Sequence, residues 1–262
     1  MRLVDIHVHL RMEDPLMDRH VEIAQEKGIS ALLVHGAPND ICPPLGDNEH
    51  ILTAMNKHPR YVLGSMQVDL RNDSSQTIET IRRYAGEGFR CVKMYPNLGF
   101  DPADPAHDPV WEAIEEHGLM CLPHCGYISI SPIYPKLSLT SLTASPFHFE
   151  RAARMFPGIQ FVMAHFGGAA TYLETLVLCM RLANFHADCT PGQGLWVWKR
   201  RLPGIEDMPF DHFLWGTDEG PEAIDGSLAF WNETLDSMDI GRADRERFFG
   251  GNAATLLGLS GS

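Results

Sequence analysis

Eight short apolar runs, each separated from the next by a stretch with helical spacing, dominate this sequence. Each run is nearly continuous in aliphatic and β-branched side chains, which is typical of strands buried on both faces of a parallel sheet. We expect strands at 3–9, 29–35, 61–68, 89–95, 119–124, 159–165, 185–189 and 212–218. Eight such units in 262 residues favour an α/β fold of the closed (β/α)8 type, the TIM barrel.

The segments between the strands predict helices, most of which end at a glycine or before a proline. We expect them at 15–27, 48–58, 74–85, 108–117, 145–156, 171–182, 221–238 and 242–257. A doubly wound open sheet is the alternative, but the chain lacks the Gly-x-Gly-x-x-Gly turn and the phosphate loop of such folds. No linker or internal repeat interrupts the alternation, so we predict one domain over residues 1–262.

The charge balance limits the partners that the chain can bind. It has 34 acidic and 21 basic residues and a net charge of −13, which argues against nucleic-acid or anionic-membrane surfaces because phosphates require clustered Lys and Arg.

Cys91 and Cys121 lie in strand-like runs, as expected of reduced thiols in a cytosolic protein. No apolar stretch is long enough to cross a bilayer, and no leader precedes the first strand. We expect a cytoplasmic protein that binds a small-molecule substrate, with homo-oligomer formation left open.

Polar side chains that can bind metals recur at the carboxyl ends of the predicted strands, where a barrel places its chemistry. His7 and His9 share one face of the first strand because strand side chains alternate. The predicted strands five, six and eight end at His124, His165 and Asp218. Each residue alone has an ordinary structural explanation, but their occurrence on one rim indicates a shared site.

This set of side chains suits a divalent cation. Three imidazoles and one carboxylate are ligands that zinc prefers, and the ion lowers the pKa of a bound water toward ~7. A further group must then move protons, and His165 has the right chemical type and position. Asp218 can bind the ion and also accept a hydrogen bond from the attacking water. We expect zinc, with manganese and iron as alternatives.

The ordered set of motifs resembles the amidohydrolase superfamily. The motifs are Asp5-x-His7-x-His9, His124, Ala164-His165-Phe166-Gly167-Gly168 and Gly216-Thr217-Asp218, with further likeness at 92–96, 184–188 and 251–259. More narrowly, the chain is similar to the branch that contains aminocarboxymuconate semialdehyde decarboxylase, resorcylate decarboxylases and small hydrolases. The resemblance implies a barrel with a catalytic acid/base at His165 and metal ligands at His7, His9, His124 and Asp218.

Lys93, near the end of the fourth predicted strand, bears on the number of ions. In superfamily members with two ions a carboxylated lysine on this strand bridges them, whereas the branch that this chain resembles usually holds one ion. We favour one ion, with Lys93 as a substrate contact or an interior structural charge, and two ions if Lys93 is carboxylated. Arg11, just beyond the histidine pair, is a further candidate to hold a substrate carboxylate.

Three functions remain open on the sequence alone. We favour a metal-dependent hydrolase of a small carboxylated or cyclic substrate, in which activated water attacks a C–N or C–O bond and His165 protonates the leaving group. This preference rests on the compactness of the chain and the breadth of the hydrolase class. The first alternative is a non-oxidative decarboxylase of a small aromatic or muconate-like acid. The second is a non-catalytic barrel, either one whose metal is purely structural or a binding protein. We expect loops 36–47, 96–107 and 126–144 to select the substrate.

Overall fold

A computed structural model of the protein describes residues 1–38, 45–128, 139–190, 198–199 and 209–259. Its strands pair in chain order in one parallel sheet, with bounds β1 (Leu3–His9), β2 (Ile29–His35), β3 (Val62–Gln67), β4 (Cys91–Met94), β5 (Met120–Pro123), β6 (Phe161–Met163), β7 (Phe185–Asp188) and β8 (Phe213–Leu214). Backbone hydrogen bonds then join β1 to the segment after β8, from Ile6 N to Trp215 O (3.2 Å) and from Asp218 N to His7 O (2.7 Å). The sheet therefore forms a nearly closed barrel, and the predicted (β/α)8 fold is confirmed.

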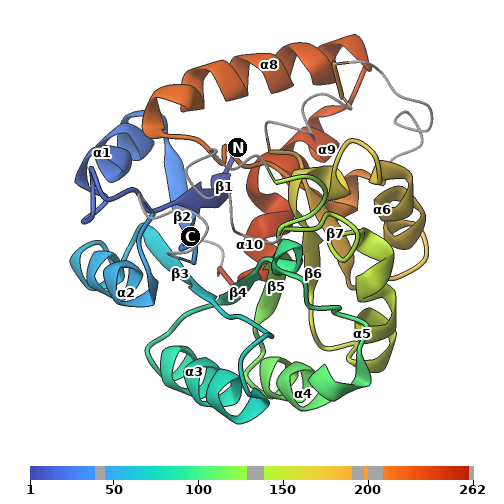
Figure 1. Ribbon diagram of the computed structural model, residues 1–262. Coiled ribbons are helices and arrows are strands. Elements are labelled where there is room, and N and C mark those ends of the chain that lie inside the picture. The colour runs from blue at the N-terminus through green and yellow to red at the C-terminus, as the bar shows by residue number, and fades with distance from the viewer. Residues whose placement is uncertain (39–44, 129–138, 191–197, 200–208, 260–262) are drawn as a thin grey trace.

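Helices surround the strands, as Figure 1 shows. They are α1 (Asp18–Glu26), α2 (Asn48–Lys57), α3 (Ser74–Gly86), α4 (Asp108–Glu116), α5 (Glu150–Met155), α6 (Tyr172–Cys179), α8 (Ile224–Ser237), α9 (Arg242–Glu246) and α10 (Asn252–Leu256). Short 3-10 turns include η4 (Ala164–Gly167) and η7 (Pro221–Ala223). Within the described part of the chain, each helix is too short or too polar to cross a membrane.

The last predicted helix, at 242–257, is wrong in its continuity. It is two helices, α9 and α10, joined by a π-helical turn at Arg247–Gly251. At this turn the backbone passes close to the start of β1, so that a Cβ on Gly250 would lie 2.5 Å from Arg2 O. The carbonyl of Phe248 also accepts a hydrogen bond from Trp215 N at 3.0 Å. Packing of the turn against β1 and the segment after β8 therefore interrupts the helix.

The barrel interior has an apolar layer toward the amino ends of the strands. It is formed by residues of six strands and by Ala164 at the start of η4. The strand residues are Val4, Ile6, Ala31, Leu33, Cys91, Met120, Leu122, Val162 and Leu214. Ala253 and Leu257, in α10 and at its C-cap, pack against this layer. Because α10 covers that end, the opposite, carboxyl end of the barrel is the one left for a binding site.

An irregularity in β1 turns the two leading histidines into the barrel. The pairing of β1 with β2 shifts between Asp5 and Val8. Ile6, before Val8, belongs to the inner apolar layer, whereas Val8 packs in the outer core between sheet and helices. A one-residue shift reverses the face to which the following side chains point. His7 and His9 therefore continue the inward side above the apolar layer.

Two predicted strands, 159–165 and 212–218, end more than one residue earlier than expected. β6 ends at Met163 and β8 at Leu214, so His165 and Asp218 lie beyond the strands. Both have left-handed backbones, with φ of 55° and 53°, a conformation incompatible with a continuing strand. Non-glycine residues in this region concentrate at functional sites.

Some sequence-based predictions fall on residues that the structure leaves undescribed. These are Cys42 and parts of the predicted substrate loops 36–47 and 126–144, namely residues 39–44 and 129–138. The other cysteines are buried free thiols.

Candidate metal centre

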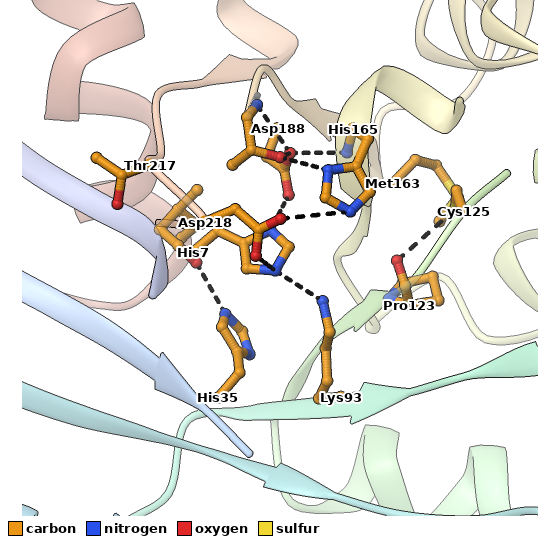
Figure 2. Close-up of polar contacts among 12 residues, drawn as sticks. His7, His35, Lys93, Pro123, Cys125, Met163, His165, Asp188, Thr217 and Asp218 are labelled. Atoms are coloured by element: carbon orange, nitrogen blue, oxygen red, sulfur yellow. Dashed lines mark hydrogen bonds and ion pairs between the residues drawn. The ribbon is translucent and has the colours of Figure 1, made fainter. Parts of the chain in front are cut away.

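Three side chains meet at the carboxyl end of the barrel. Nε2 of His7 and Nε2 of His9 each lie 3.2 Å from Oδ1 of Asp218. One ligand atom of each residue lies within 4.8 Å of the other two, and Figure 2 shows His7 and Asp218 side by side. Two imidazole nitrogens and a carboxylate oxygen are suitable ligands for a divalent transition metal or zinc.

Burial and charge keep His7 and Asp218 in the protonation states that bind metals. Burial lowers the pKa of His7 to about 4, and the charge of Lys93 acts in the same direction, so the imidazole is neutral at neutral pH. Burial alone would raise the pKa of Asp218, but attraction to His7 and a hydrogen bond from His9 hold this pKa well below its usual value. A neutral imidazole and an ionised carboxylate are the forms that metal binding requires. The residues therefore fit a divalent ion.

Asp188, the last residue of β7, orients His7. Its Oδ2 lies 2.8 Å from Nδ1 of His7. A carboxylate accepts hydrogen bonds, so His7 donates from Nδ1 and turns the lone pair of Nε2 toward Asp218. Burial opposes ionisation of Asp188, yet His7 and its hydrogen bond hold the pKa of this carboxyl well below the usual value. This role was not predicted, although a lone carboxylate at the end of a buried strand was a signal for it.

The same carboxylate orients His165. Oδ1 of Asp188 accepts hydrogen bonds from His165 N at 2.8 Å and from the Thr190 hydroxyl at 2.6 Å. Because the hydroxyl hydrogen is used there, Oγ1 of Thr190 accepts from Nδ1 of His165 at 2.8 Å. The lone pair of Nε2 then faces Asp218, whose Oδ2 lies 3.8 Å away (Figure 2). This arrangement suits a proton-transferring group beside the candidate metal centre.

Asp5 ties the two ends of the sheet together at this site. Its buried carboxylate accepts hydrogen bonds from Thr217 N at 3.0 Å, from Thr217 Oγ1 at 2.7 Å and from His7 N at 3.2 Å. Burial raises the pKa of Asp5 to about 7 in spite of these bonds. They hold β1 against the segment that carries Asp218, so ligands from opposite ends of the sequence stay in register.

His124 lies on the same rim but outside the group of three ligands. Its ring centroid is 4.9 Å from that of His165, and the ring stacks on Tyr95 at 5.9 Å. Its Nε2 lies 3.4 Å from Tyr127 O. Burial lowers the pKa of His124 well below the usual value, and the nearby His165 acts in the same direction. The role of His124 as a fourth ligand stays a prediction.

Lys93 reaches the candidate metal centre, and Arg11 reaches only its margin. Nζ of Lys93 is 2.9 Å from Nε2 of His7, and burial lowers the pKa of this fully buried amine. Arg11 is half-exposed and lies 4.0 Å from Glu219. Their roles as substrate contacts stay predictions.

His35, on β2, was not predicted as part of this site. Its ring centroid is 4.9 Å from that of His7, and its Nε2 donates to Ile6 O at 3.0 Å. A histidine at the end of a buried strand was again a signal for a position on this rim. The ring of His35 therefore packs edge-on against the ring of His7.

Comparison with known proteins agrees with this geometry. A family model described as amidohydrolase matches residues 4–259. The chain belongs to the amidohydrolase family. No curated protein sequence matches it at a significant level.

Solved structures share this amidohydrolase fold at low sequence identity. A 2,6-dihydroxybenzoate decarboxylase from Rhizobium aligns with a TM-score of 0.72 and 17% identity over 100% of both chains. A Pseudomonas putida protein assigned as a 2-pyrone-4,6-dicarboxylic acid hydrolase gives 0.66 and 17%, over 100% of this chain and 99% of that one. A 5-carboxyvanillate decarboxylase from Novosphingobium aromaticivorans with bound manganese gives 0.65 and 17%, over 93% of this chain and 81% of that one. Because the neighbours include both activities, the fold does not separate hydrolases from decarboxylases.

The contact between Asp188 and His7 predicts a measurable loss in this amidohydrolase. We expect Asp188→Asn to weaken metal binding by about 10–100-fold, because the neutral amide no longer raises the basicity of His7 or fixes its tautomer. Competition with a chromogenic chelator measures the affinity. The matched control is Thr190→Val, which removes the hydrogen bond to His165 but leaves the Asp188–His7 pair, and should keep wild-type affinity. Equal affinity in Asp188→Asn and wild type would contradict this role.

Proposed function

We propose that this amidohydrolase is a metal-dependent hydrolase of a small carboxylated or cyclic substrate. The observation that supports it is the convergence of His7, His9 and Asp218, with Nε2 of His165 facing the same carboxylate. His7, His9 and Asp218 would hold the ion, with His124 as the fourth ligand. A divalent ion supplies a Lewis acid and lowers the pKa of water there, and zinc fits this donor set, with manganese and iron as alternatives.

Side chains of the protein would position the attacking water, transfer its proton and contact the substrate. Oδ1 of Asp218 faces the two histidines and Oδ2 faces His165, so the carboxylate can accept a hydrogen bond from an attacking water between them. Nδ1 of His165 is committed to Thr190, and Nε2 therefore takes the proton from the water and returns it to the leaving nitrogen or oxygen. Lys93 and Arg11 are the cations proposed to contact the substrate. One ion fits this scheme, with Lys93 as an unmodified amine.

The deciding experiment combines metal analysis with a substrate panel. Protein purified without added ions should contain one divalent ion per chain by elemental mass spectrometry. The panel pairs lactones and amides with aromatic acids, and each reaction is followed both for hydrolysis products and for released carbon dioxide. Hydrolysis without carbon dioxide is the expected result.

Other outcomes would replace parts of this proposal. Carbon dioxide release without hydrolysis would assign the decarboxylase activity that two of the structural neighbours carry. Two ions per chain, together with a carbon dioxide adduct on Lys93 in intact-protein mass spectra, would replace the one-ion scheme. A wild-type protein that binds no ion would overturn the metal-dependent function.

A further inference from the structure

A pocket opens beside His9, one of the three residues of the candidate metal centre. Its volume is about 230 Å³, and its wall is built from Pro221 and Glu222 of η7 and from seven residues at and after the end of β1, namely His9, Arg11, Glu13, Asp14, Met17, Arg19 and His20. That volume is below the range typical of whole drug-sized ligands and suits one part of a small organic molecule. Because His9 belongs both to the pocket and to the candidate metal centre, a ligand there would adjoin the reacting group.

Three residues of the pocket wall each carry a buried nitrogen without a hydrogen-bond partner among the described residues. The atoms are Nδ1 of His9, Nε of Arg11 and Nε2 of His20. His20 is only 3% exposed. Buried polar atoms in folded proteins almost always have partners, in the protein or in ordered water, so three such atoms in the wall of one small pocket leave hydrogen bonds that a ligand could supply.

His20 is held in place by the start of α1. The carboxylate of Asp14 accepts hydrogen bonds from Asp18 N at 3.0 Å and from His20 N at 3.2 Å, so Asp14 caps the helix. Burial lowers the pKa of His20 to about 4, and the imidazole is therefore neutral. The backbone of His20 is therefore held at the pocket wall, and the carboxylate of Asp14 is engaged by the backbone N–H groups at the start of the helix.

The three nitrogen atoms share one chemical preference. Nε of Arg11 can only donate, so its partner must be an acceptor. When Nε2 of His9 acts as a metal ligand, its hydrogen sits on Nδ1, and Nε2 of a neutral His20 can donate in the same way. Among the described residues, Arg11 forms an ion pair with Glu219, but the separation of 4.0 Å is too long for a hydrogen bond. A ligand carboxylate would satisfy these donors.

The rim of the pocket limits the charge of that ligand. Glu13 and Glu222 both line the pocket and are exposed. These two carboxylates outnumber Arg19, the exposed cation of the lining, so they oppose a second negative charge nearby, although solvent weakens the repulsion. The pocket therefore suits a single carboxylate better than a dianionic phosphate.

We propose that this pocket is the subsite for one carboxylate of the substrate, and that His20 is a specificity-determining residue in it. Arg11 provides the charge, and His20 adds a directed hydrogen bond from the pocket wall. The proposal deepens the function proposed above and rests on it, because the subsite adjoins the same candidate metal centre.

The test uses benzoate, benzamide and phenyl phosphate as probes of the full-length protein purified without added ions. Long-range ¹H–¹⁵N spectra of the histidine side chains report contact with Nε2 of His20, and titration gives the dissociation constants. Benzoate should shift the His20 signal and bind at least about tenfold more tightly than the other two probes, as a hydrogen bond to a charged group predicts. His20→Phe keeps a ring but removes the donor, and should weaken benzoate binding by about tenfold or more. His20→Gln, whose amide nitrogen can replace Nε2, should recover most of the affinity.

His186→Phe is the matched control, because His186 is also a buried imidazole with an unpartnered nitrogen among the described residues but lies outside the pocket wall. It should bind benzoate as wild type does. An unshifted His20 signal with all three probes, or wild-type benzoate affinity in a folded His20→Phe, would overturn the subsite. The metal content of the same samples is measured separately. Absence of the ion with an intact benzoate effect on His20 would therefore refute the metal-dependent function and leave the subsite standing.

Discussion

Asp218→Asn should lose the metal ion and, with it, turnover. Asp218 is the only carboxylate in the described group of three ligands, and both histidine Nε2 atoms lie 3.2 Å from its Oδ1. The amide keeps the size of the side chain but removes the negative charge that offsets a cation. Loss of an outer carboxylate weakens metal sites by about 10–100-fold, and loss of a direct ligand should exceed that range. Elemental mass spectrometry after dialysis gives the metal content, and the substrate panel gives the rate.

The neighbouring residue provides the matched control for this substitution. Glu219→Gln makes the same change from carboxylate to amide one position along, at an exposed side chain outside the ligand group. It should keep the full metal content. His7→Ala should behave as Asp218→Asn does, because it removes another member of the group. Full retention of the ion in both His7→Ala and Asp218→Asn would exclude this centre.

The barrel was predictable because its signals are local. The alternation of apolar runs with helical spacing is written along the chain, and strand order in a (β/α)8 barrel follows chain order. The exceptions arise where distant segments meet. The break between α9 and α10 depends on the close approach of Gly250 to Arg2, which no local pattern records.

The sequence was enough to predict which residues form the candidate metal centre, but not which contacts orient their side chains. His7, His9 and Asp218 were identified from strand ends, and the structure brings them together. Their inward orientation depends on the register shift in β1, which simple alternation does not indicate. The double role of Asp188 depends on contacts with His7 and with the backbone N–H of His165, residues 181 and 23 positions away in the sequence. Those contacts exist only once the sheet has closed.

His165→Asn should keep the fold and the ion but lower kcat by about 10²–10⁴-fold, the usual contribution of a general acid or base. Asparagine suits this position because it tolerates the left-handed backbone, here with φ of 55°. Its short amide can also replace Nδ1 in the hydrogen bond to Thr190. Only Nε2, the atom that faces Asp218, is removed. Steady-state kinetics on the hydrolysed substrate, with metal analysis of the same preparation, measure both effects.

The metal content of His165→Asn also distinguishes the one-ion and two-ion schemes. With one ion, His165 moves protons and is no ligand, so the content should stay at the wild-type value while kcat falls. With two ions bridged by a carboxylated Lys93, His165 becomes a ligand of the second ion, and its loss should release one ion of the two. Lys93 lies close enough for either arrangement, with Nζ 2.9 Å from Nε2 of His7. An unchanged kcat with unchanged metal content would remove His165 from the chemistry altogether, and proton transfer would then need another group on the same rim.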